Sequence, residues 1–68
     1  MFTKTQLKKR IDDLAMNMRS YLSDDALPTQ YMLGAYDTYV EVYGDYDPLR
    51  KEGVLTKEVE NKIIYGRD

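Results

Sequence analysis

Apolar residues in the first third of the chain recur at the spacing of one helical face. They lie three or four positions apart, at Leu7, Ile11, Leu14, Met18 and Tyr21. This period predicts an amphipathic helix over residues 4–22. Thr3 and Gln6 have the types and the spacing of a capping box, which marks the start of that helix.

A second helical pattern covers residues 30–43. Pro28 disfavours helix at the residue before it, and Thr29 is of a type that caps helix N-termini. Gly44 is placed to end the helix, because glycine adopts a left-handed conformation at little steric cost. We therefore predict a break after the first helix and a second helix that ends at Tyr43.

The remaining segment predicts a short turn and a third helix. Asp47 followed by Pro48 has the pattern of a capped first turn. Thr56 then caps a helix over residues 57–65, and no stretch alternates long enough to predict a strand. The expected fold is all-α, a compact three-helix bundle with a short extra turn between the second and third helices. A chain of this length is expected to form a single domain, residues 1–68.

The second predicted helix separates its tyrosines from its acids. At about 100° per residue, Tyr36, Tyr39 and Tyr43 fall within one sector, whereas Asp37 and Glu41 fall on the other side. Buried tyrosines usually keep the hydroxyl within reach of a polar partner. We therefore interpret the three tyrosines mainly as core residues whose hydroxyls reach the rim, and the acids as a solvated face.

The apolar part of this helix is larger than the rest of the chain is expected to cover. It occupies more than half of the helix circumference, and such a helix is normally enclosed from more than one direction. Tyrosine also tolerates water in a free protein and burial in a complex. We therefore expect a second copy of the chain or another protein to cover one flank, formed by Tyr31, Ala35 and Val42.

The charges are unevenly distributed, although the net charge is only −2. Between Ser20 and Leu49 the chain carries six acids and no lysine or arginine. Such a run can steer association with a cationic surface, although surface acids also serve solubility alone. The leading prediction is a protein partner with a basic surface. The predicted contact residues are Tyr31, Asp37, Glu41, Val42, Asp45, Tyr46 and Asp47.

A basic cluster near the N-terminus supports a second interpretation, a dimeric nucleic-acid-associated protein. Its predicted phosphate contacts are Lys4, Lys8, Lys9 and Arg10. The segment GVLTKEVENKI has some likeness to the turn and reading helix of a DNA-binding motif. However, Glu58 and Glu60 stand there in place of the arginine or asparagine that reads bases. Direct nucleic-acid binding is therefore the second choice.

The residue types present favour a protein without an active site. The chain has no cysteine and no histidine, which removes thiolate chemistry and the commonest general base and metal ligand. Asp45 and Asp47 open like a calcium loop, but Leu49 and Arg50 stand where a ligand and a glycine are required. The glycines form no phosphate-binding pattern. We expect no catalysis, no metal and no cofactor.

The apolar runs are too short to predict a membrane helix, which needs about 20 residues. The first residues, MFTKTQLKKR, lack the apolar centre of a secretory signal. Together with the missing cysteines, this predicts a cytoplasmic protein.

In size, acidity, tyrosine content and lack of cysteine and histidine, the chain resembles the small proteins that bacteriophages and other mobile elements encode to block a host machine. Anti-restriction and anti-CRISPR proteins belong to this class. The resemblance implies a non-enzymatic inhibitor or adaptor in the host cytoplasm, which docks on a larger and nucleic-acid-handling protein. If the chain blocks its target, occlusion of a basic surface is the expected mechanism, because the acidic run between Ser20 and Leu49 matches such a surface in charge.

Overall fold

The computed structural model of the chain describes residues 2–66 and confirms the all-α prediction. Four helices follow one another along the chain, α1 over Lys4–Ser23, α2 over Gln30–Tyr43, α3 over Pro48–Lys51 and α4 over Lys57–Tyr65. The described residues contain no strand. The turn predicted after Asp47 is a single turn of α-helix, α3.

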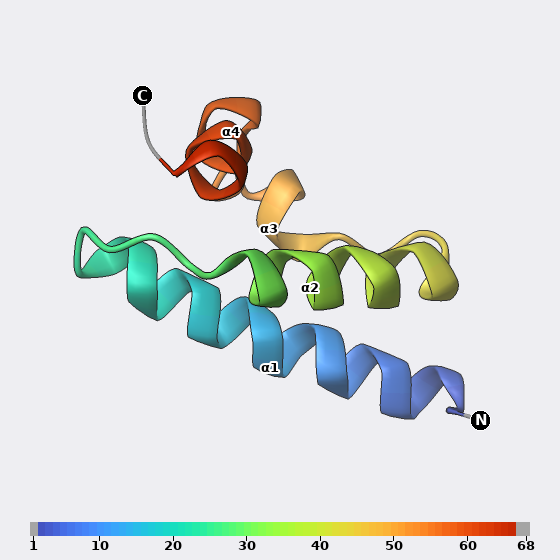
Figure 1. Cartoon of the computed structure of the whole chain (residues 1–68). Coiled ribbons are helices and arrows are strands. Elements are labelled where there is room, and N and C mark those ends of the chain that lie inside the picture. Colours follow the sequence, from blue (N-terminus) through green and yellow to red (C-terminus); the bar gives the residue numbers. More distant parts are fainter. Residues whose placement is uncertain (1, 67–68) are drawn as a thin grey trace.

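The helices form an antiparallel α1/α2 hairpin with α3 and α4 on one side of it (Figure 1). The backbone of α4 approaches α2, and the backbone of α3 approaches α1. A simple three-helix bundle is therefore not confirmed, because α3 and α4 share the third position. The bidentate contact between Arg19 and Glu52, with an N–O distance of 2.9 Å, further joins α1 to the end of α3.

The predicted caps account for the helix starts. The Thr3 hydroxyl accepts from the Gln6 N–H at 3.1 Å, while the Gln6 side chain accepts from the Thr3 N–H at 3.0 Å. Thr29 and Thr56 each accept from the backbone N–H three residues on, at 3.1 and 3.2 Å. Each such cap stabilises its helix by about 1 kcal/mol. Gly44 follows α2 with a φ of 113°. This conformation ends the helix and turns the chain toward α3.

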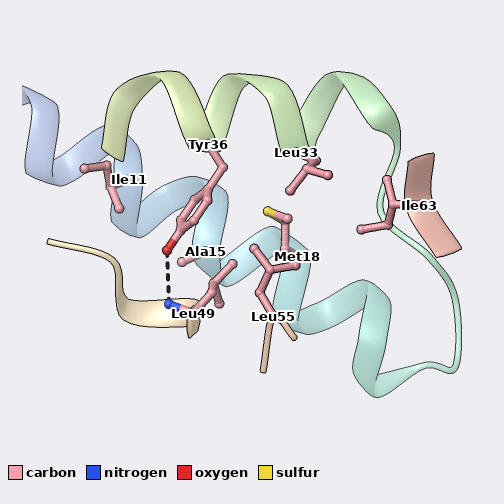
Figure 2. Packing of buried hydrophobic residues seen from close by; sticks show 8 residues of the cluster. All are labelled: Ile11, Ala15, Met18, Leu33, Tyr36, Leu49, Leu55 and Ile63. Atoms are coloured by element: carbon pink, nitrogen blue, oxygen red, sulfur yellow. Dashed lines mark hydrogen bonds between the residues drawn. The ribbon is translucent and has the colours of Figure 1, made fainter. Parts of the chain in front are cut away.

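The core lies where the hairpin meets α3 and α4 (Figure 2). Eight buried residues form one cluster, Ile11, Ala15, Met18, Leu33, Tyr36, Leu49, Leu55 and Ile63. Every helix contributes to this cluster, so each is held by the burial of at least one apolar side chain. The core therefore fixes which sides of α1 and α2 remain at the surface.

Candidate interaction surface

Tyr36 is wholly buried, and its hydroxyl does not reach the rim as predicted. The hydroxyl accepts a hydrogen bond from the Leu49 N–H at 3.0 Å (Figure 2). It also donates one to Asp47 Oδ1 at 2.7 Å. The rim prediction was wrong because the start of α3 lies directly against the ring and supplies both polar partners. Burial, followed by the bond to Asp47, raises the pKa of Tyr36.

Arg50 supplies the counter-charge that the acidic run was expected to lack. Its guanidinium contacts Asp37 at 2.8 Å, Asp47 at 2.7 Å and Glu60 at 3.0 Å. Burial works against the charged form of Arg50, but the bonds to these three carboxylates outweigh it and raise its pKa. Asp37 and Asp47 therefore belong to an internal ion-pair network that joins α2, α3 and α4.

Asp47 has two structural roles in that network. Its carboxylate accepts hydrogen bonds from the Tyr36 hydroxyl and the Arg50 guanidinium. As the N-cap of α3, it also accepts from the backbone N–H of Arg50. Burial opposes ionisation, but the hydrogen bonds from Tyr36 and Arg50 are stronger in sum and lower the pKa of Asp47. The carboxylate is thus held charged by its own fold.

Tyr46 is also engaged within the chain. Its hydroxyl donates to Asp12 Oδ1 at 2.5 Å, and its ring centroid lies 5.7 Å from that of Tyr43. The bond to Asp12, followed by burial, raises the pKa of Tyr46. The side chain joins α1 to the loop after α2, which leaves it less surface for a partner than predicted.

The four basic residues near the N-terminus divide between two parts of the α1 surface. The Lys4 and Lys8 ammonium groups lie over the rings of Tyr43 and Tyr46, 4.4 and 5.1 Å from the ring centroids. The Lys9 ammonium lies 3.5 Å from Asp13, and the Arg10 guanidinium lies 4.3 Å from the centroid of Phe2. Because consecutive helical residues diverge by about 100°, these groups do not form a single phosphate-binding face.

The predicted apolar flank of α2 is largely open. Tyr31 is 83% exposed and Val42 is 64% exposed, while Ala35 is half-buried. Neither α3 nor α4 covers this side, because both lie against the opposite side of the hairpin. The exposure of Tyr31 and Val42 agrees with the expectation that this chain alone does not cover them.

A groove between α1 and α2 adjoins this flank. Part of it, about 220 Å³, is lined by Arg10, Asp13, Leu14, Asn17, Tyr31, Ala35 and Tyr39. A neighbouring hollow of about 270 Å³ is lined by Phe2, Gln6, Lys9, Arg10 and Asp13. The two share Arg10 and Asp13, so we treat them together as the hairpin groove. The sequence analysis named Lys9 and Arg10 only as phosphate contacts and Leu14 only as part of the apolar stripe of α1, and it did not place any of them beside the flank of α2.

Two of the predicted contact acids remain at the surface without an internal partner. Glu41 and Asp45 are exposed, and neither forms an ion pair within residues 2–66. Glu41 lies in the last turn of α2, about 100° around the helix from the exposed Val42, and Asp45 follows Gly44 in the loop after the helix. We call Glu41, Val42 and Asp45 the acidic end of α2.

Within residues 2–66, no three acidic side chains lie close enough together to hold a metal ion. None of the helices in that range combines the length and the apolar character that a bilayer crossing requires.

Comparison with known proteins adds no relative. No protein-family model, curated protein or solved structure matches the chain. The resemblance to inhibitors from phages and mobile elements therefore stays a prediction.

Proposed function

We propose that this chain is a non-enzymatic protein-interaction domain that docks through the open flank of α2. One observation carries the proposal: α2 buries Tyr36 completely but leaves Tyr31 83% exposed. Tyrosine is enriched among the residues that dominate binding energy at protein interfaces. A large ring held on a rigid helix loses little conformational freedom when a partner covers it, which favours binding.

The charge at one end of this flank favours a partner with a basic surface. Glu41 and Asp45 form no ion pair within residues 2–66, whereas Asp37 and Asp47 both contact Arg50. Opposite charge on a partner would raise the association rate and fix its orientation on the flank. The docking residues then reduce to Tyr31, Glu41, Val42 and Asp45. Blocking a basic surface of the partner is the effect that this arrangement supports best.

Affinity capture from the organism that encodes the chain tests this proposal. We expect the wild type to retain one specific protein. The double variant Tyr31→Ser, Val42→Ser should retain at least tenfold less of that protein. The pair Glu41→Gln, Asp45→Asn should weaken capture at low salt more than at high salt, because screening already removes the charge effect.

Tyr65→Ser is the matched control, since Tyr65 is 76% exposed but lies on α4, away from the flank. It should capture as much as the wild type. Equal capture by the flank variant and the control would overturn the proposed docking surface. Turnover of a substrate by the purified chain would overturn the non-enzymatic assignment.

A further inference from the structure

We propose that the hairpin groove is closed by a second copy of this chain, so that two hairpins stack on their open sides. This inference rests on the proposed function, because it assigns an occupant to the Tyr31 end of the same flank. In this arrangement the second copy covers Tyr31, and the basic partner is left with the other three docking residues, Glu41, Val42 and Asp45.

The position of the groove suits such a stack. Residues on one side of the hairpin contact α3 and the loop before it, as Arg19 does through Glu52 and Asp12 through Tyr46. The groove lies on the other side, with α1 along one wall and α2 along the other. Two hairpins that meet there would form a four-helix layer, a common arrangement of helical proteins, around a seam of mixed apolar and polar residues.

The surface also has the shape of a self-complementary contact. On α2, the small residue Ala35 lies one helical turn from both Tyr31 and Tyr39, so that a notch separates two rings. Tyr31 is more exposed than the other large apolar side chains of residues 2–66. A large ring from one copy can therefore enter the notch of the other, and a two-fold axis makes the same contact twice.

The available area is sufficient for a weak dimer. A fully exposed aromatic side chain can bury about 150–250 Å². Of the three rings that border the groove, Tyr31 is largely exposed, Phe2 is partly exposed and Tyr39 is already half-buried within the chain. With Leu14 and the polar residues that line the two hollows, each copy offers on the order of 500 Å², which gives about 1,000 Å² in total. That total lies at the lower limit of specific interfaces, so we expect an association in the micromolar range or weaker.

The charges of the groove favour a second copy over a basic partner. Lys9 and Arg10 stand at its border beside the single acid Asp13, which Lys9 already contacts at 3.5 Å. A strongly basic protein would meet charges of its own sign there. A second copy brings Asp13 as well as Arg10, so Arg10 of each copy can pair with Asp13 of the other across the two-fold axis, while the exposed Lys9 stays at the border in solvent.

Sedimentation equilibrium over a wide concentration range tests the inference. The wild type should approach twice the 8.0 kDa mass of one chain as its concentration rises. Tyr31→Ser should raise the dimer dissociation constant at least tenfold, and Ala35→Glu should abolish the dimer by placing an acid in the notch. Tyr65→Ser should behave as the wild type does. Circular dichroism melts would establish that each variant remains folded.

A wild-type chain that stays monomeric at roughly 1 mM would overturn the inference, since even millimolar association is visible at that concentration. So would a folded Tyr31→Ser variant that dimerises normally. The proposed function fails separately: a monomer that captures a different protein through Tyr31 refutes the second copy alone. A Tyr31-dependent dimer that captures nothing supports the second copy and refutes the heterologous partner.

Discussion

The Tyr36 hydroxyl and the Asp47 carboxylate lie 2.7 Å apart, and through this contact the buried face of α2 positions the start of α3. The same hydroxyl accepts the Leu49 N–H, which is buried and has the Tyr36 oxygen as its partner. One side chain therefore completes the polar contacts of a helix that is only a single turn long.

Removing this hydroxyl should destabilise the whole domain. Tyr36→Phe leaves the ring in place but leaves the buried Leu49 N–H without its acceptor, at a cost of about 1–3 kcal/mol. Urea denaturation followed by circular dichroism measures the loss. Tyr39→Phe is the control, because the Tyr39 hydroxyl makes no hydrogen bond within residues 2–66, and it should change the stability little. Equal stability of both variants would contradict the role given to Tyr36.

The Arg50 network predicts how stability depends on acid. The pKa of Asp47 is lower in the folded chain than its ordinary value of 3.8, so folding favours the charged form. This contribution is fully present above about pH 4 and is lost as the pH falls through the lower, folded pKa. We expect the free energy of unfolding to fall in that acidic window.

Arg50→Gln tests this acid dependence, because it removes the positive charge that forms ion pairs with Asp37, Asp47 and Glu60. It should reduce stability at neutral pH and flatten the acid dependence, because Asp47 then gains less from ionising. Arg50→Lys should recover only part of the loss, since a compact ammonium cannot donate to three carboxylates with the same geometry. An acid profile that is unchanged in Arg50→Gln would show that other groups control it.

The contact between Lys4 and Tyr43 should be a small stabilising interaction. A cation over an aromatic ring near the surface contributes about 0.5–1 kcal/mol. Lys4 is also the first residue of α1, where the helix dipole repels a positive charge, and this repulsion offsets part of the stabilisation. A double-mutant cycle with Lys4→Gln and Tyr43→Leu separates the two effects, because the helix-end effect appears in both arms. We expect a favourable coupling in that range at low salt, and additive effects of the two substitutions would rule the contact out.

The helices and their caps could be predicted from sequence because their signals are local. Thr3 and Gln6 lie within one turn of each other, so no distant part of the chain decides their hydrogen bonds. The open flank could also be predicted, because the apolar arc of α2 is a property of one helix. Tyr31 and Val42 are exposed as a consequence of that arc.

The polar contacts of the predicted site could not be obtained in the same way. Asp12 and Tyr46 are 34 residues apart, and they meet only because Gly44 turns the chain back along α1. Arg50 reaches Asp37 and Glu60 for a similar reason: the direction of α3 relative to α2 and α4 decides it. A count of charges between Ser20 and Leu49 omits Arg50, which lies just outside that segment. For this reason Asp37 and Asp47 were predicted to lack a basic partner within the chain.

Photo-cross-linking from position 31 in the native cell tests the central claim most directly. Tyr31 is replaced by p-benzoylphenylalanine, and Tyr65 is replaced in the same way in a parallel chain as the control. We predict a discrete cross-linked product from position 31, either a dimer of the chain or an adduct with another protein, and little or none from position 65. An absence of product from position 31, or the same products from both positions, would contradict the claim that the open flank of α2 is an interaction surface.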